Sequence, residues 1–283
     1  MSGWSFAFSK RWAGYLALTV VFAVICSCLG MWQFARRAEA RAEIARIDAN
    51  YDSAPVPIDQ ALPDLDSFDI SQRWVPVEVV GTYLTADELL VRNRPYGGQP
   101  GFEVLTPLLL DDGSVFVVDR GWLPTGDEQD APDEVPAAPS GTVTVVARLK
   151  AGEPILASRS TVPGSGEIAT INLPQIEDLV GQPLYTGAYG LVASESPQPD
   201  DAPIPSIRPE RDEGPHLSYA LQWFVFGLLA FVGLGYALRQ EYRETNAEDP
   251  EERERAEERA RKRAARAPTD SEVEDELVAR GGR

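Results

Sequence analysis

The sequence predicts a membrane protein in which two transmembrane helices flank one mostly β domain, an antiparallel barrel or sandwich with short helices. Residues 12–35 and 217–238 contain no Asp, Glu, Lys, Arg or His. Each stretch can cross a hydrocarbon core, which needs about 20 apolar residues. Between them, runs with period-two alternation and many β-branched residues recur, as is typical of half-buried strands.

The first predicted membrane helix covers residues 12–35. Trp12 and Trp32 lie near its ends, and basic residues lie just beyond both, as at membrane interfaces. The alternative is a cleaved signal peptide, because a basic pair precedes the apolar run and residues 25–28 loosely resemble a lipoprotein cleavage site. The uncharged run continues past Cys28 to a Trp and Arg anchor, which favours a retained helix.

This helix is expected to continue beyond the membrane. Residues 38–49 contain strong helix formers and neither Pro nor Gly. The helix should therefore extend to Asn50, because Pro55 and Pro57 follow it.

Six runs between the membrane helices are predicted strands. They are residues 74–83, 89–94, 102–110, 115–121, 143–149 and, more weakly, 185–193. Asp111-Asp112-Gly113 should form a hairpin turn, because Gly accepts the positive φ of tight turns. Residues 173–180 are predicted to form a short helix, and residues 126–141 a surface loop. The proline-rich residues 194–215 should form an extended linker back to the membrane.

The second predicted membrane helix fixes the expected topology. Arg239, Arg243 and further basic residues follow it, which favours a cytoplasmic location for that end. We therefore expect a plasma-membrane protein with both termini in the cytoplasm. Its predicted parts are a cytoplasmic N-terminus (1–11), the first membrane helix (12–35), an extracytoplasmic β domain with a Pro-rich linker (36–215), the second membrane helix (216–238) and a charged cytoplasmic tail (239–283).

The composition argues against several functional classes. The net charge of −18 disfavours nucleic acid as a partner. The only cysteines, Cys26 and Cys28, lie in the first membrane helix, and the only histidine is His216. The β domain therefore has no disulfide and no Ser-His-Asp or Cys-His site, and we predict that the protein is not an enzyme.

Two alternatives involve Lys150 and the cysteine pair. Lys150 is the only lysine between the helices and leaves open a Ser-Lys dyad of signal-peptidase type, although an ordinary surface lysine is expected. Cys26 and Cys28 suggest copper, but residues two apart on a helix point about 200° from each other. Small packing residues are the expected explanation of these cysteines.

His216 is the candidate ligand residue. It stands at the outward end of the second membrane helix, where an ionisable group is costly unless it is used. One helix face would contain His216, Tyr219 or Ala220, Trp223 and Gly227. A metal-binding imidazole beside aromatic rings suits a planar apolar ligand such as haem. The alternative is an interfacial histidine that caps the helix.

The topology places the end of the first membrane helix at the same depth as His216. Trp32, Gln33 and Arg36 should therefore lie near this histidine. Arg36, or its neighbour Arg37, would then be able to pair with a carboxylate beside an iron ligand.

Four motifs resemble those of a known family. They are Gly30-x-Trp32-Gln33-x-x-Arg36, Thr106-Pro107-Leu108, Val118-Asp119-Arg120-Gly121-Trp122-Leu123-Pro124 and Gly214-Pro215-His216-Leu217-x-Tyr219-Ala220-x-Gln222-Trp223-Phe224. In order, spacing and topology they resemble the surfeit-locus-protein family of cytochrome c oxidase assembly factors, over residues 12–240. Asp119 departs from the pattern, in which Asn precedes Arg-Gly-Trp. If that amide is functional, Asp119 lacks it, and if the residue only ends a strand, Asp serves as well.

The resemblance implies a membrane-anchored, non-catalytic assembly factor that presents or stabilises haem a for insertion into subunit I of cytochrome c oxidase. It implies that His216 is the haem and metal ligand, with Tyr219 and Trp223 beside it. The expected partners are subunit I, haem a synthase and membrane lipid. The alternative is a structural chaperone that clamps an oxidase subunit through the β domain without binding haem.

Overall fold

The computed structural model describes residues 3–127, 130–156 and 166–265 and divides into two units. One unit comprises Met1–Ala38 and Gly214–Arg283, and the other comprises Glu39–Glu213. Part of the predicted charged tail (266–283) and part of the predicted surface loop (128–129) lie outside the described residues.

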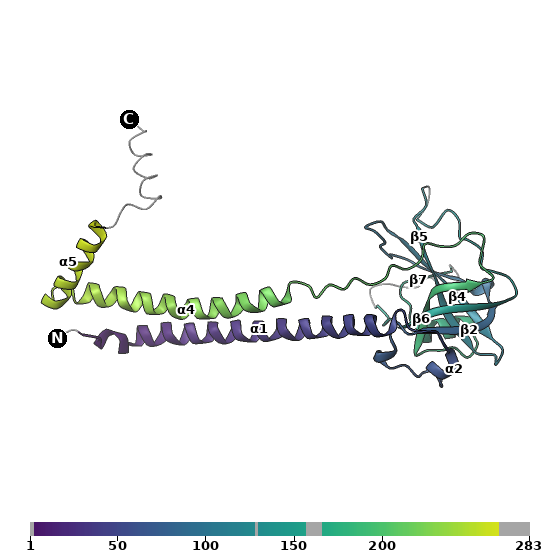
Figure 1. The fold of residues 1–283 in the computed structure, drawn as a ribbon, viewed down its shortest axis with the longest axis horizontal. Coiled ribbons are helices and arrows are strands. Elements are labelled where there is room, and N and C mark those ends of the chain that lie inside the picture. Colours follow the sequence, from purple (N-terminus) through teal and green to yellow (C-terminus); the bar gives the residue numbers. More distant parts are fainter. Residues whose placement is uncertain (1–2, 128–129, 157–165, 266–283) are drawn as a thin grey trace, which may run out of the picture. The chain divides into compact units, whose positions relative to one another are not determined.

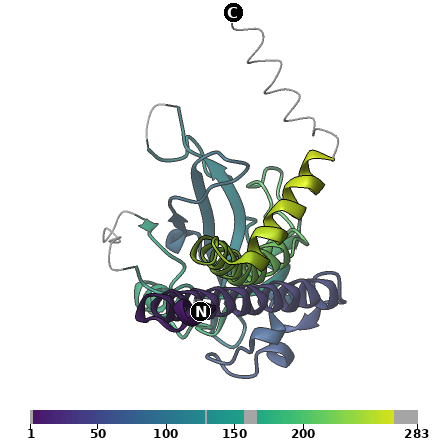
Figure 2. The same cartoon turned by 90° about the vertical axis from the view of Figure 1, so that its left-hand side faces the viewer.

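Two helices, α1 (Lys10–Asn50) and α4 (His216–Thr245), are long and apolar enough to cross a membrane. Large apolar side chains are exposed along both, among them Leu18, Val24 and Leu228. Such surface is rare on soluble proteins and suits lipid. Both predicted membrane helices are present, and they lie side by side (Figures 1 and 2).

The ends of this unit carry two shorter helices. The 3-10 helix η1 (Ser5–Phe8) precedes α1, and α5 (Pro250–Ala264) follows α4. On α5, acids and bases pair one turn apart, as in Arg255 with Glu251 and Lys262 with Glu258. This is the solvated charged helix expected from the Glu, Arg and Ala composition.

The β domain is a closed barrel with additional edge strands (Figure 1). Its strands are β1 (Val56–Pro57), β2 (Pro76–Tyr83), β3 (Leu89–Val91), β4 (Gly101–Leu110), β5 (Val115–Pro124), β6 (Thr142–Ala151), β7 (Glu167–Ile168) and β8 (Ala188–Ser196). The hydrogen-bonded order is β1-β2-β6-β8-β5-β4-β3-β7, and β2 also pairs with β4. The ring β2-β6-β8-β5-β4 therefore has no open edge, and the predicted fold class is confirmed.

The short helices of this domain are α2 (Ile58–Ala61), η2 (Ile70–Gln72), η3 (Thr85–Asp87) and α3 (Leu173–Val180). The limits of α3 are those predicted from the sequence. The Asn172 side chain accepts a hydrogen bond from the Gln175 backbone N–H at 3.1 Å, and Gly181 ends the helix at φ 71°. The predicted hairpin turn is also present, with Gly113 at φ 82° between β4 and β5.

One neighbour pair in the ring is parallel. Val118 of β5 lies opposite Gly190 of β8, and these two strands run in the same direction. The purely antiparallel arrangement expected from the sequence is wrong for this pair. Parallel neighbours require a long crossover, and the chain between β5 and β8, which contains β6, β7 and α3, provides it.

Both faces of the barrel wall are buried at β5. Phe116 and Val118 point into the barrel interior, where all five ring strands contribute apolar side chains. Val115 and Val117 point outward into a second cluster, which includes Ile47 of α1 and residues of α3. The last turns of α1 and the helix α3 therefore cover the outer face of the barrel.

Polar bonds hold the end of α1 to the domain. Glu43 accepts a hydrogen bond from Trp74 Nε1 at 2.8 Å and pairs with Arg73 at 3.2 Å. Asn50 donates to the carbonyl oxygens of Ser71 and Arg73 at 2.7 and 2.8 Å. These bonds satisfy backbone groups of the segment that leads into β2.

The proline-rich segment after β8 differs from the predicted linker. β8 continues to Ser196, and Ile204 exchanges two backbone hydrogen bonds with Trp122 of β5, at 2.7 and 2.9 Å. Prolines on both sides of Ile204 obscure the strand character of this segment in the sequence. Two ion pairs hold its later part to the end of α1 and the turn after it: Arg211 with Asp48 at 2.7 Å and Arg208 with Asp52 at 2.8 Å.

Gly121→Ala tests the docking of this segment. Gly121 has φ 134°, and a Cβ there would lie 2.5 Å from the Ile204 carbonyl oxygen. We expect the substitution to lower the free energy of unfolding by about 2 kcal/mol, because it combines backbone strain with a steric clash. Thermal unfolding of the full-length protein, followed by near-UV circular dichroism, measures the change.

Gly113→Ala is the matched control. Gly113 also has a positive φ, 82°, but a Cβ there meets no atom within 4 Å. In this control, only backbone strain should lower the free energy of unfolding, by about 1 kcal/mol. Equal losses in the two variants would show that Ile204 does not lie against Gly121.

Candidate functional site

The first candidate site is a hydrogen bond between the two membrane helices. His216 Nδ1 and Gln33 Oε1 lie 2.8 Å apart. His216 is the first residue of α4, directly after Pro215 and the left-handed Gly214 at φ 67°. The sequence places His216 and Gln33 at a common depth, and the structure joins their side chains.

This hydrogen bond defines the chemistry of the imidazole. An amide oxygen only accepts, so Nδ1 is the donor in this hydrogen bond. In the neutral tautomer with the proton on Nδ1, the lone pair of Nε2 remains for another partner. Within the described ranges, the structure gives Nε2 of His216 no hydrogen-bond partner. Metal-binding histidines are commonly oriented in this way, by a hydrogen bond from the ring nitrogen that does not bind the metal. The pair can therefore supply one oriented neutral nitrogen ligand.

Small residues bring α1 and α4 together beside this pair. A Cβ at Gly30 would lie 2.8 Å from the Phe224 ring, and one at Gly227 would lie 3.6 Å from Cys26 Cβ. Cys26 is buried in this contact, whereas Cys28 is exposed. Among the described residues, no group of three or more His, Cys, Asp or Glu is arranged to hold a metal ion. The burial of Cys26 fits the packing explanation, whereas the exposed Cys28 does not take part in this contact.

The other predicted site residues surround this contact less closely. Trp32 and Tyr219 are 55% and 49% exposed, while Ala220 is fully buried. The helix face that the sequence assigns to His216 thus continues through Ala220, with Tyr219 beside it. Trp223 packs edge-on against Phe226, with ring centroids 6.0 Å apart.

The two predicted arginines follow Gln33 by about one turn of α1. Arg36 is exposed and Arg37 is partly buried. Residues three and four apart on a helix lie on one face. Both arginines are therefore near the helix face that carries Gln33.

A second group of polar residues lies on the outer face of the barrel. Arg94 pairs with Glu103 at 3.0 Å and with Glu153 at 2.5 Å. Asp119 is buried beside them in β5, where its Oδ1 accepts a hydrogen bond from the Gly121 N–H at 3.0 Å. Asp119 therefore lies within the strand and does not end it.

Burial controls the protonation of this group. Burial, together with the negative charge of Glu103, raises the pKa of Asp119 well above its ordinary value. Burial also raises the pKa of Glu103 and of the Tyr189 hydroxyl. In the described parts of the chain, neither Asp119 Oδ2 nor the Tyr189 hydroxyl has a hydrogen-bond partner. A protonated, neutral Asp119 is the form favoured at this position.

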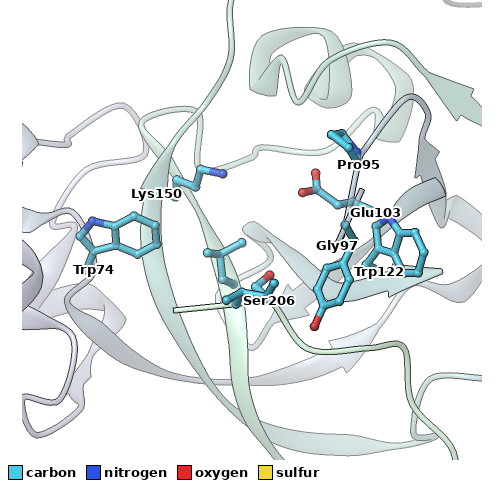
Figure 3. Close-up of a pocket in the computed structure, with 10 residues that line it drawn as sticks. Trp74, Pro95, Gly97, Glu103, Trp122, Lys150 and Ser206 are labelled. Carbon is cyan, nitrogen blue, oxygen red and sulfur yellow. The ribbon is translucent and has the colours of Figure 1, made fainter. Parts of the chain in front are cut away.

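A cavity of about 240 Å³ adjoins this group (Figure 3). Lys150 lines it and is partly buried. Its Nζ lies 5.6 Å from the ring centroid of Tyr189, its cross-strand neighbour in β8. The sequence does not reveal this position, because it depends on how β6 pairs with β8.

The Ser-Lys alternative has partial support from position only. Ser206 lines the same cavity as Lys150. In the part of the chain that the structure describes, no hydrogen bond joins the two side chains. A catalytic dyad requires such a contact, so the support for the dyad is limited to the shared cavity.

The fold defines a class of membrane protein with a β-barrel domain between two apolar helices. The chain belongs to the SURF1 family, whose model matches residues 20–228. The family resemblance identified from the four motifs is thereby confirmed.

Three relatives illustrate this similarity. A SURF1-like protein of Mycobacterium tuberculosis is 34% identical over 242 residues, which cover 84% of this chain and 88% of the relative. A SURF1-like protein of Monosiga brevicollis is 31% identical over 160 residues, 52% of this chain and 59% of the relative. The cytochrome oxidase assembly protein SHY1 of Saccharomyces cerevisiae is 30% identical over 121 residues, 42% of this chain and 30% of the relative.

Asp119→Asn tests the protonation of the buried carboxyl group. A group whose pKa is raised by folding favours the folded state at low pH, and this stability is lost as the pH rises through the folded-state pKa. Asn keeps an acceptor for the Gly121 N–H but has no charge. We expect the variant to unfold at a higher temperature than the wild type at about pH 8, with little difference at about pH 4.

Thermal unfolding across this pH range measures the effect. Asp111→Asn is the control, because Asp111 is exposed in the β4–β5 turn, and it should shift the unfolding temperature little at either pH. A loss of stability in Asp119→Asn at the higher pH would contradict the assignment.

Proposed function

We propose that the protein is a non-catalytic, membrane-anchored assembly factor of cytochrome c oxidase that presents or stabilises haem a for insertion into subunit I. Membership of the SURF1 family and the name of the SHY1 relative support the role in oxidase assembly. The His216–Gln33 hydrogen bond is the observation that supports haem binding. Subunit I, haem a synthase and membrane lipid are the partners in this proposal.

The residues around His216 fit a haem on the outer side of the helix pair. The contacts at Gly30 and Gly227 leave no room for a macrocycle between α1 and α4 at those levels. The half-exposed rings of Trp32 and Tyr219 offer flat apolar surface. If haem binds, it would supply the iron, and His216 would supply one nitrogen ligand.

Two features of the sequence affect how tightly haem would be held: the arginines after Gln33 and the presence of a single histidine. Arg36 or Arg37 is near enough to Gln33 along α1 to pair with a haem propionate. His216 is the only histidine in the chain, so no second imidazole can complete the coordination from within the protein. Binding through one imidazole suits a protein that passes its ligand on.

The rival function is a structural chaperone that clamps an oxidase subunit through the β domain and never binds haem. Family membership is equally consistent with this function. The absorbance spectrum of the purified protein separates the two functions, because bound haem has a Soret band.

The proposal also includes an orientation. We place the protein in the cell membrane with both termini in the cytoplasm and the β domain outside. Arg239 and Arg243 after α4 support this orientation, since basic residues flanking a membrane helix favour the cytoplasmic side.

The haem site is tested in protein purified from cells that make haem a. His216→Ala should remove or shift the Soret band, because it removes the only imidazole. Gln33→Leu should keep the ligand but weaken haem retention by about tenfold or more, because the imidazole loses the acceptor that orients it. Arg36→Ala should weaken retention without changing the type of spectrum.

Gln240→Leu is the matched control for Gln33→Leu. Gln240 is an exposed glutamine of α4 whose side chain bonds only to Glu244. The Gln240→Leu variant should bind haem as the wild type does. An unaltered spectrum in His216→Ala, at normal levels of inserted protein, would exclude His216 as the ligand.

The cellular role is tested by deletion and complementation. Deletion should lower the amount of assembled oxidase and its haem a content without abolishing haem a synthesis. Wild-type protein should restore both, and His216→Ala should not. Normal oxidase in a deletion strain without a second homologue would contradict the assembly role, and full rescue by His216→Ala would favour the clamp.

The orientation is tested with single cysteines in a background with Cys26→Ala and Cys28→Ala. Ser140 in the β domain and Ala256 in α5 are both exposed. On intact cells, an impermeant maleimide should label Ser140→Cys and not Ala256→Cys. The reverse pattern would invert the proposed topology.

A further inference from the structure

The cavity on the β domain has the features of a second ligand site. We propose that it binds a carboxylate attached to one aromatic or similarly flat apolar group, either as a small acid or as the C-terminal residue of a polypeptide. This site is separate from the proposed haem site, because its residues belong to a different unit of the chain.

Lys150 supplies the positive charge. Its ammonium group lines the cavity, and among the described residues no carboxylate forms an ion pair with it. Arg94, which lies beside the cavity, is already held between Glu103 and Glu153. Lys150 is therefore the lysine of this cavity that can still contact the anionic group of a ligand directly.

Among the described residues, the neighbouring carboxyl groups do not contact Lys150. Figure 3 shows the Lys150 ammonium and the Glu103 carboxylate on opposite sides of the cavity, pointing toward one another. One oxygen of Glu103 is engaged by Arg94 at 3.0 Å. Asp119 is buried in β5, and burial raises its pKa well above the ordinary value. A ligand carboxylate in contact with Lys150 is therefore opposed mainly by Glu103, whose charge Arg94 offsets in part.

Two tryptophans form walls for a flat apolar group. Trp74 and Trp122 lie on opposite sides of the cavity in Figure 3. Hydrogen bonds fix both rings: Trp74 Nε1 donates to Glu43 at 2.8 Å, and Trp122 Nε1 donates to the Arg94 carbonyl oxygen at 2.7 Å. Tyr96 stacks on Trp122 with ring centroids 5.1 Å apart. The aromatic surface is therefore in place before a ligand binds.

The size of the cavity limits the ligand. Its volume is about 240 Å³, which is below the roughly 300–1,000 Å³ of sites for drug-sized molecules. A single ring with a short acid side chain fits, whereas a haem macrocycle does not. The proline-rich segment after β8 forms the remaining wall with Ser206 and Ile207, and the Ile207 side chain is 61% exposed.

Isothermal titration calorimetry with the full-length protein in nanodiscs tests which class of ligand binds. The probes are 3-phenylpropionate, its neutral amide and phenethylamine, which share one ring and differ in charge. We expect 3-phenylpropionate to bind about tenfold or more tightly than the amide, because only the acid pairs with Lys150. Equal or tighter binding of the amide or of phenethylamine would overturn the proposal.

Variants test the residues. Lys150→Met should weaken 3-phenylpropionate binding by about tenfold or more, while Lys150→Arg should retain most of it. Lys262→Met, which removes an exposed lysine of α5, is the control and should have no effect. Ile207→Trp should block the opening and abolish binding, and its exposed position makes folding insensitive to the change. Wild-type binding in both Lys150→Met and Ile207→Trp would overturn the proposal.

A further pair of probes separates the two sources of the carboxylate. N-acetylphenylalanine mimics a C-terminal residue, and N-acetylphenylalanine amide mimics the same residue within a chain. Binding of the acid at the strength of 3-phenylpropionate supports a polypeptide C-terminus, and binding of 3-phenylpropionate alone supports a small acid. Absence of binding for all acids would overturn the proposal and leave the haem proposal unaffected.

Discussion

Contact between the two membrane helices depends on residues with little or no side chain. In lipid, an apolar side chain gains no hydrophobic free energy when it moves from contact with lipid to contact with another helix. Helix association therefore depends on close packing and polar contacts. Gly30 admits the Phe224 ring, and Gly227 lies against Cys26. These contacts fix the antiparallel register of α1 and α4, and this register places His216 opposite Gln33. The proposed ligand chemistry is thus a consequence of helix packing, because a shift of one turn would leave the imidazole without its acceptor.

The motif in β5, one of the four that resemble the family, consists of residues whose roles are mainly structural. Asp119 faces the buried polar group outside the barrel, and Arg120 donates to two backbone carbonyl oxygens of the loop after β5, at 2.9 and 3.1 Å. Gly121 allows Ile204 to approach, and Trp122 pairs with Ile204 while its ring lines the cavity. Four successive residues therefore have four different roles, and each requires its own residue type. A motif of this kind identifies a fold more directly than a reaction.

The sequence predicted the elements whose signals are local. Uncharged length indicated both membrane helices, and the Asn cap and following Gly indicated α3. It did not indicate the parallel β5–β8 pair or the docking of Ile204, because both depend on which distant segments meet. At the candidate site, the shared depth of His216 and Gln33 followed from topology, whereas the position of Lys150 required the strand register. Local sequence patterns thus predicted helices and strands, whereas the pairing of distant segments determined which side chains line the same cavity.

The position of β8 in the barrel constrains the order of folding. β8 lies between β6 and β5, although it is the last strand to be synthesised. Until it is added, β5 and β6 both present unpaired edges, and exposed edges promote association with other strands. The barrel therefore remains open until nearly the whole domain has been synthesised. A nascent chain held at the membrane by α1 would pass through this vulnerable stage before closure removes both edges in a single step.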